Sequence, residues 1–366
     1  MAKRHRSFAS VRSVVARVEE LVLGSSGADA FELVFALSAA KLLKKKVALR
    51  SEPGVKRAVV GHVREAALCW PSLEVLPTVD VPDDVLIRVL ALLDEANEGT
   101  HTRGEALDAL FEQLVSRVGK GEKGQFFTPR HVVDVAVRLL APKAGELVVD
   151  PACGSGAFLA HARAYPGVKT WGSDLDGRAV RVAKLLAIAT GADPDAFVRA
   201  DGLRKGGLVP ARIDVVATNP PFAGEVNIEG YEMTRLVSRA ERDALFLERS
   251  VLLLRPGGRL AIVLPNNKVS ALAWSPLRRW LLTHARVFAV VSLPRETFLP
   301  HTSQRTVLLL AKRRAAPAKT PDRSERIFFA VSERAGKDAS GEPAEHDLEE
   351  IVPPLTSFLA KEGFGS

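Results

Sequence analysis

The chain has 366 residues, of which 47% are hydrophobic and 26% charged, so it is long enough for a large folded core and is neither low-complexity nor fibrous. Its two cysteines exclude a disulfide framework, and no uncharged apolar run approaches the roughly 18 residues that a membrane-spanning helix needs. We therefore expect a cytoplasmic protein without a membrane partner, and its formal net charge of +8 suits nucleic-acid binding and generic solubility equally well.

The first 118 residues are predicted to form a helical domain. Apolar residues recur there at helical spacing, Asp29 stands where a helix cap is expected, and Pro82 followed by two aspartates is typical of a helix start. The individual helices are predicted over residues 11–23, 29–46, 81–96 and 103–118. A glycine-rich charged link follows and marks the end of this domain.

Residues 119–314 are predicted to form a second domain of the α/β class. Short apolar strands alternate there with helices, which indicates a mostly parallel sheet covered on both faces. The strands are predicted over residues 146–150, 169–174, 198–201, 213–219, 258–265, 287–294 and 305–313, with helices over 156–165, 178–190 and 244–254. Residues 315–366 are predicted as a linker and C-terminal tail with a short apolar piece and a closing helix.

A glycine turn follows the first predicted strand, in "LVVDPACGSGAFLA". The strand ends at Asp150, and Gly154 and Gly156 allow positive φ and the close approach of a ligand to the main chain. The spacing matches neither the dinucleotide fingerprint nor the P-loop. Because glycine turns between strands and helices are also common without a ligand, this turn alone does not establish a site. Cys153 is interpreted as a small turn residue rather than a nucleophile.

Acidic residues end the next two strands, in "WGSDLD" and "VRADGL". An acid at the end of the second strand is where nucleoside-binding sheets hold ribose hydroxyls, so Asp174 suits a ribose. Asp201 closes the third strand, where it suits the amino group of an adenine. Taken singly, each aspartate is better explained as a cap or turn residue, and only their placement after successive strands favours a ligand contact. Asp176 is interpreted as a helix cap.

The stretch "IDVVATNPPF" is an apolar strand that stops at Asn219. Proline cannot sit inside a central strand, so an amide and the aromatic ring of Phe222 stand on a stiff turn beyond it. The structural alternative is a strand-terminating turn with a buried phenylalanine. No histidine or cysteine cluster has metal-ligand spacing, and His131 is interpreted as a surface or cap residue.

Together these segments resemble class I methyltransferases that use S-adenosylmethionine, whose fold is Rossmann-like with a mostly parallel seven-stranded sheet. "NPPF" is similar to the [DNS]PP[YFW] motif of enzymes that methylate exocyclic amines of adenine or cytosine. "GQFFTPR" is similar to the segment that precedes the sheet in adenine-specific enzymes. With "DPACGSGAFL", "LLRPGGRLAIVLP" and "LPRETFLP", these motifs stand in the order found in modification subunits of type I restriction-modification systems, between Gly124 and Lys312.

The resemblance implies methyl transfer from S-adenosylmethionine to N6 of an adenine flipped out of double-stranded DNA, without a metal. Asn219 and Pro220 would supply two oxygen acceptors for the amine, Pro221 would stiffen their turn, and Phe222 would stack on the base. Phe298 is a further aromatic residue that could approach the base or belong to the core. The residues implied to bind the cofactor are Gln125, Phe126, Phe127, Thr128, Pro129, Arg130, Asp150, Gly154, Ser155, Gly156, Ala157, Asp174 and Asp201.

Two features of the implied cofactor set bear on the local fold. Thr128 and Pro129 also suit a cap and the start of a helix, so part of this segment has a structural explanation. Ala157 stands where the family often has a third glycine, and a residue this small should be tolerated.

Several alternatives stay open from the sequence. The turn is also compatible with cytosine N4 as target, with a protein glutamine or ribosomal RNA methyltransferase, and with a non-catalytic binding module. Only about fifty residues follow Lys312, too few for a large target-recognition domain. We therefore expect a separate DNA-specificity subunit as a partner. A restriction subunit is a further candidate partner that the sequence leaves open. Because the chain is shorter than typical modification subunits, a divergent defence system or an independent enzyme also remains open.

Overall fold

The computed structural model of the protein describes residues 11–43, 54–97, 103–118, 127–204, 208–222, 224–226, 228–299, 301–338 and 343–365. The chain divides into two compact units, each described here by itself. The helical unit comprises Met1–Lys120 and Arg178–Asp195, and the sheet unit comprises Gly121–Gly177 and Ala196–Ser366. The domain boundaries expected at residues 118 and 314 stay a prediction.

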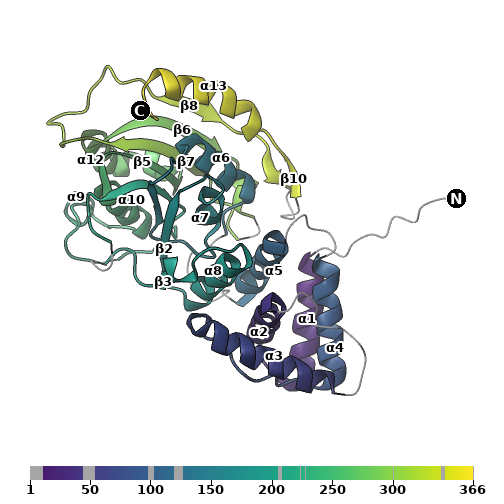
Figure 1. Ribbon diagram of the computed structural model, residues 1–366. Coiled ribbons are helices and arrows are strands. Elements are labelled where there is room, and N and C mark those ends of the chain that lie inside the picture. The colour runs from purple at the N-terminus through teal and green to yellow at the C-terminus, as the bar shows by residue number, and fades with distance from the viewer. Residues whose placement is uncertain are drawn as a thin grey trace. The chain divides into compact units, whose positions relative to one another are not determined.

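The helical unit contains α1 (Val11–Ser26), α2 (Ala30–Leu43), α3 (Val55–Cys69), η1 (Pro71–Leu73), α4 (Asp83–Asn97), α5 (Arg103–Val118) and most of α8 (Gly177–Ala189) (Figure 1). The predicted cap is confirmed, because the side chain of Asp29 accepts the Phe31 N–H at 2.9 Å. No single described helix is long and apolar enough to cross a membrane; α1 and α2 meet that test only as a pair, across a bend of 112°.

An aromatic cluster forms part of the core of the helical unit. The ring of Phe31 lies 5.7 Å from Phe35 and 5.9 Å from Phe111, all three being fully buried. From α8, the guanidinium of Arg181 lies 4.4 Å from the Phe35 ring and pairs with Glu32 of α2 at 2.7 Å. These contacts explain why α8 belongs to this unit although it connects two strands of the sheet.

The sheet unit is built on an eight-stranded sheet of order β3-β2-β1-β4-β5-β7-β6-β8. Its strands are β1 (Leu147–Asp150), β2 (Lys169–Asp174), β3 (Phe197–Arg199), β4 (Ile213–Thr218), β5 (Leu254–Pro265), β6 (Ala285–Leu293), β7 (Thr306–Arg313) and β8 (Phe328–Val331). The seven predicted strands are confirmed, and β8 is an eighth strand beside β6. Only β7, within this sheet, runs antiparallel to its neighbours.

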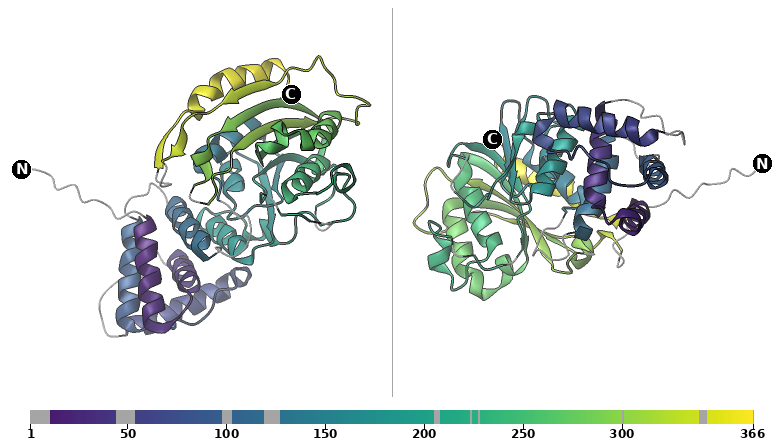
Figure 2. Two further views of the ribbon diagram at one scale, coloured as in Figure 1. Left: turned by 180° about the vertical axis from the view of Figure 1, so that it is seen from behind. Right: turned by 90° about the horizontal axis from the view of Figure 1, so that it is seen from below.

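Helices cover both faces of this sheet (Figure 2). On one face α6 (Arg130–Leu140) packs against α7 (Ala157–Ala162) and α13 (Leu348–Lys361). The other face carries α9 (Met233–Leu236), α10 (Arg242–Leu253), α11 (Asn267–Ser270) and α12 (Ser275–His284). Short 3₁₀ turns lie at η2 (Pro194–Ala196), η3 (Leu272–Trp274) and η4 (Arg295–Phe298). The apolar runs of the central strands are buried between these layers, as expected for a parallel sheet.

The segment predicted as a linker and tail folds into the sheet unit. β8 extends the sheet, and α13 contacts both β8 and α6. The two-stranded hairpin β9 (Ala335–Lys337) and β10 (Pro343–His346) contacts η4 through β9. Figure 1 shows this C-terminal segment running along the sheet beside α6.

Candidate active site

The predicted site residues gather at one edge of the sheet. β2, β1 and β4 are parallel neighbours, so their carboxyl ends lie side by side. These strands end at Asp174, at Asp150 and directly before Asn219. β2, which follows β1 in the chain, lies on one side of β1, and the later strand β4 lies on its other side. The strand order thus reverses at β1, and open α/β sheets bind ligands at such a switch point.

The glycine turn after β1 is held by backbone hydrogen bonds. Gly154 has φ +51°, Gly156 has φ +87°, and the Gly156 N–H donates to the Cys153 carbonyl at 2.8 Å. A Cβ placed on Gly154 would find no atom within 4 Å, so the main chain faces open space there. Ser155 is buried, and Ala157 begins α7 directly after the turn.

Two ionisable side chains at this turn, those of Asp150 and Cys153, are buried. Asp150 is 1% exposed and accepts the Ala152 N–H at 3.0 Å, and burial raises its pKa to about 7. Burial also raises the pKa of the Cys153 thiol well above its usual range. At neutral pH Cys153 therefore stays a thiol, which agrees with its interpretation as a turn residue rather than a nucleophile.

The two strand-end aspartates differ in what they contact. Asp174 links two segments, because its carboxylate accepts the Gly154 N–H at 2.8 Å and the Asp176 N–H at 2.9 Å. Burial raises its pKa, although the side chain remains partly exposed at the site. Asp201 accepts the Leu203 N–H at 3.0 Å and pairs with Arg204 at 3.3 Å, which makes it a local turn residue. A contact of either acid with a nucleoside stays a prediction.

The nitrogen and the oxygen of the Asn219 side-chain amide differ in their hydrogen bonding. Its Nδ2 donates a hydrogen bond to the hydroxyl of Thr128 at 3.0 Å. Its Oδ1 is buried and has no hydrogen-bond partner among the described residues. The following Pro220 is buried and Pro221 half-buried, so the turn is held by packing as well as by proline stiffness.

Phe222 lies inside the protein rather than on an open surface. It is 5% exposed, and its ring lies edge-on to Phe298 with the centroids 5.7 Å apart. Phe298 is 1% exposed and is thus a core residue that contacts the turn. Stacking of Phe222 on a base stays a prediction.

The segment ahead of α6 is described only in part. Gln125 and Phe126 lie outside the described residues, whereas Phe127 is half-buried. The expectation that Thr128 caps the helix is wrong. Pro129 occupies the cap position with φ −54°, the helix begins at Arg130, and no side chain caps it. The Thr128 hydroxyl instead binds the Asn219 amide.

His131 is neither a surface residue nor a cap. Its ring is half-buried and stacks on His346 of β10, with the centroids 4.7 Å apart and the planes 16° from parallel. Burial lowers its pKa to about 4, and the nearby His346 and Lys337 act in the same direction. His131 therefore stays neutral at physiological pH and joins α6 to the C-terminal hairpin.

One buried ionic cluster near the site was missed in the sequence. Lys268 of α11 is 1% exposed and pairs with Glu241 at 2.6 Å and Asp243 at 3.1 Å. The adjacent Arg242 N–H donates to the Gly224 carbonyl at 3.1 Å, which ties the segment after Phe222 to the start of α10. A single lysine among many surface charges has no pattern that would have revealed this role.

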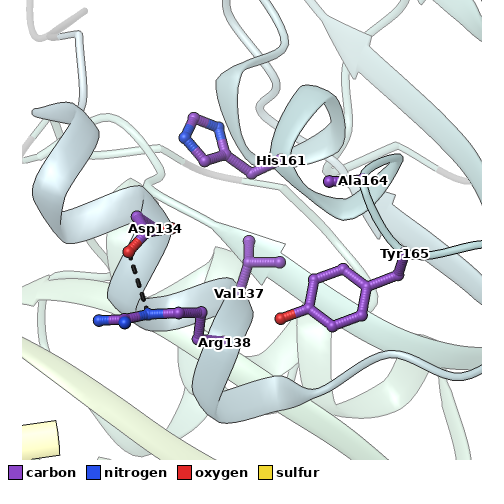
Figure 3. A pocket seen from close by; sticks show the side chains of 6 residues that line it. All are labelled: Asp134, Val137, Arg138, His161, Ala164 and Tyr165. Carbon is purple, nitrogen blue, oxygen red and sulfur yellow. Dashed lines mark ion pairs between the residues drawn. The ribbon is translucent and has the colours of Figure 1, made fainter.

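A separate pocket of about 330 Å³ opens between α6 and α7 (Figure 3). The residues that line it are Asp134, Val137, Arg138, His161, Ala164 and Tyr165. Arg138 pairs there with Asp134 at 3.0 Å and with Glu349 of α13 at 2.7 Å. Because none of the predicted site residues lines this pocket, it is not part of the predicted site.

The sequence matches the model of a known protein family, N-6 DNA Methylase, over residues 99–363, which is more than half of the chain. Among curated relatives, the EcoEI methylase subunit of a type I restriction enzyme from Escherichia coli is 29% identical over 245 residues, covering 62% of this chain and 50% of that protein. The StySJI methylase subunit from Salmonella typhimurium is 26% identical over 271 residues, covering 64% and 50%. The chain thus spans about half the length of these relatives.

Solved structures support the fold assignment. A protein from Listeria monocytogenes described as a class I S-adenosylmethionine-dependent methyltransferase aligns with a TM-score of 0.62 at 15% identity, covering 98% of each chain. The methyltransferase subunit of a type I restriction-modification system from Streptococcus thermophilus also gives a TM-score of 0.62, at 19% identity, covering 91% of this chain and 79% of that one. The predicted class I methyltransferase fold is confirmed.

Proposed function

The chain belongs to the N-6 DNA methylase family, and from this premise we propose that it transfers a methyl group from S-adenosylmethionine to N6 of an adenine flipped out of double-stranded DNA. The observation that carries the proposal is the buried Oδ1 of Asn219, which has no partner among the described residues. Leaving a buried acceptor unpaired costs about 1–3 kcal/mol, and the amine of a substrate would supply the missing donor.

The residues at the edge of the sheet fit S-adenosylmethionine. When bound, this cofactor supplies an electrophilic methyl group. The open space beside Gly154 leaves room for a ligand against the main chain. Asp174 is partly exposed, and its carboxylate retains acceptor capacity beyond the amide hydrogens it already accepts, so it can also accept a ribose hydroxyl. The proposal also assigns cofactor contacts to the other residues that the sequence resemblance implies, including those outside the described part of the chain.

The turn after β4 would activate the amine. The lone pair on adenine N6 is delocalised into the ring, which makes the nitrogen a weak nucleophile. Asn219 Oδ1 and the Pro220 carbonyl would accept its two hydrogens and localise that pair, and the stiff turn keeps both acceptors aimed. The proton that the amine loses passes to solvent, because amide oxygens are too weakly basic to retain it. To stack on the base, Phe222 must turn out of its contact with Phe298.

A separate DNA-specificity subunit is proposed as partner, and a restriction subunit as a further one. The curated relatives named above are themselves described as subunits of type I restriction enzymes. The described residues that follow β7 form β8, the hairpin and α13, all within the sheet unit.

The test uses the full chain isolated from its own cells with its bound partners, together with the recombinant chain alone. Each is incubated with unmodified DNA and methyl-labelled cofactor, and the DNA is digested to nucleosides. We expect N6-methyldeoxyadenosine from the isolated complex, and no efficient sequence-specific methylation by the chain alone. Asn219→Ala should reduce methylation by about 100-fold or more while cofactor binding persists.

A matched control is Asn266→Ala. Asn266 follows the neighbouring strand β5, and its Nδ2 likewise donates to a hydroxyl, that of Ser270 at 3.2 Å. Its Oδ1 is not a buried acceptor without a partner, so methylation should persist. Label in protein or RNA instead of DNA would point to another acceptor class, and N4-methylcytosine would point to the other exocyclic amine. A chain that fails to bind S-adenosylmethionine in calorimetry would be a binding module, and the proposal would be wrong.

A further inference from the structure

The hydrogen bond between Thr128 and Asn219 joins two parts of the sheet unit that are 91 residues apart in sequence. Thr128 lies directly before Pro129 and α6, and Asn219 directly follows β4. The bond length of 3.0 Å is normal for an amide donor and a hydroxyl acceptor. The turn at Asn219 is therefore held by a hydrogen bond to the segment before α6 as well as by its connection to β4.

An asparagine amide presents either an oxygen or an NH2 group when it turns by 180°, and only the oxygen can accept a hydrogen from a substrate amine. In the structure Nδ2 points to Thr128, which leaves Oδ1 as the buried end without a partner. In the opposite orientation two donors, the Asn219 NH2 and the substrate amine, would face each other. The orientation of this amide thus decides whether the turn can act.

Thr128 is well placed to hold that orientation. Because it does not cap α6, its hydroxyl is available to the amide. Pro129 fixes the backbone next to it at φ −54°, so the hydroxyl is held on a stiff segment. Donation from Nδ2 also polarises the amide and makes Oδ1 a stronger acceptor, as expected for linked hydrogen bonds.

We propose that Thr128 is a positioning residue, which holds the Asn219 amide with its oxygen turned towards the substrate amine. This inference rests on the proposed amine-methylating function. It differs from the cofactor contact that the sequence implies for Thr128, because it acts through Asn219 rather than through the cofactor.

The test measures single-turnover methyl transfer at saturating cofactor, using the full chain isolated with its bound partners. Thr128→Val keeps the shape of the side chain but removes the hydroxyl, and should slow transfer about tenfold because Nδ2 loses its acceptor. Thr128→Ser restores the hydroxyl and should restore most of the rate. Calorimetry measures the cofactor affinity of each variant, and saturating cofactor removes any loss of transfer that arises from weaker cofactor binding. Thermal melting checks that each variant is folded.

A second pair of variants, made in a protein that carries Asn219→Asp, isolates the effect of the amide orientation on the rate of transfer. A carboxylate has two acceptor oxygens and no NH2 group, so its orientation is immaterial. In an Asn219→Asp background, Thr128→Val should therefore slow transfer much less than it does beside Asn219. A merely structural role of Thr128 would give the same loss in both backgrounds.

The outcomes separate this inference from the proposed function. If Thr128→Val transfers the methyl group at the unaltered rate when the cofactor is saturating, the positioning role is overturned. The methyltransferase assignment would still stand. An equal loss in the two backgrounds would overturn it as well. If the unaltered chain transfers methyl groups to no amine, the proposed function itself fails, and the inference falls with it.

Discussion

At the scale of single residues, Gly154 offers a test of where the cofactor is bound. Its φ of +51° disfavours any side chain, and open space surrounds the position of its Cβ. We predict that Gly154→Ala lowers the free energy of unfolding by about 1 kcal/mol, because alanine is strained in this conformation. It should also weaken S-adenosylmethionine binding at least about tenfold, because the methyl group would occupy space needed by the ligand. Calorimetry and chemical denaturation measure the two effects.

The matched control for this prediction is Gly145→Ala. Gly145 has φ +85° and also has no atom within 4 Å of its Cβ position, but it precedes β1 and lies away from the carboxyl edge. Gly145→Ala should lower the free energy of unfolding by a similar amount and leave the affinity for S-adenosylmethionine unchanged. Equal affinity in the two variants would argue against a cofactor site at the glycine turn.

Residue roles were predictable where they follow from local rules. The Asp29 cap needs only its own helix, and the stiff turn after Thr218 needs only its two prolines. The Thr128 cap was wrong because the cap position is held by Pro129, one residue later than expected. The bond from Thr128 to Asn219 could not be predicted, because it depends on the packing of α6 against the sheet rather than on any sequence spacing.

At the scale of secondary-structure elements, a stacked histidine pair joins α6 to the C-terminal hairpin. A Cβ on Gly336 of β9 would lie 2.6 Å from the His131 ring, so the hairpin packs closely on that ring. His346 and Lys337 from the hairpin disfavour a charge on His131. His301, whose pKa is also lowered by burial and by Lys337, belongs to the same basic surroundings.

We predict that this contact weakens in mild acid. The pKa of His131 is about 4 in the folded protein and 6.5 for the unperturbed side chain, so the unfolded chain binds more protons between these values. Its contribution to stability is therefore present above pH 6.5 and is lost as the pH falls, by about 1 kcal/mol between pH 7 and pH 5.5. Chemical denaturation at several pH values, compared with His131→Phe, measures this loss. Parallel pH profiles for the two proteins would contradict it.

The strands were largely predictable because their apolar runs are bounded by glycine, proline and polar residues. The antiparallel direction of β7 was not, since an apolar strand has the same pattern in either direction. β8 was identified only as a short apolar piece. Phe329 is 71% exposed and Val331 is 69% exposed, so an edge strand with one solvent-exposed face lacks the continuous burial of its neighbours.

At the scale of the whole molecule, residues 343–365 belong to the sheet unit. Arg286 of β6 pairs with Glu362 at 2.5 Å, and Lys312 of β7 donates to the Gly363 carbonyl at 3.0 Å. These contacts could not be foreseen from charged, proline-containing sequence, because the partner residues lie in strands far away along the chain. The closing helix predicted from the sequence is present as α13, but composition alone did not indicate its packing against α6 and β8.

The end of the chain should accordingly contribute to the stability of the sheet unit. Phe364 is 1% exposed, and its ring lies 5.0 Å from Phe288 of β6. We predict that Phe364→Ala lowers the free energy of unfolding by about 3–5 kcal/mol, because it removes a buried aromatic ring from a core position. Denaturant unfolding followed by tryptophan fluorescence measures this, since Trp171, Trp274 and Trp280 all lie in the sheet unit.

Phe329→Ala is the control for this change, because it removes the same ring from an exposed position on β8. A surface substitution of this kind should change the free energy of unfolding by no more than about 0.5 kcal/mol. The two variants differ in burial but not in the group removed, so a large difference between them measures how firmly the C-terminal segment is packed. If both variants unfold at the denaturant concentration of the unaltered chain, that segment contributes nothing to the sheet unit, and its contacts with β6 and β7 are incidental.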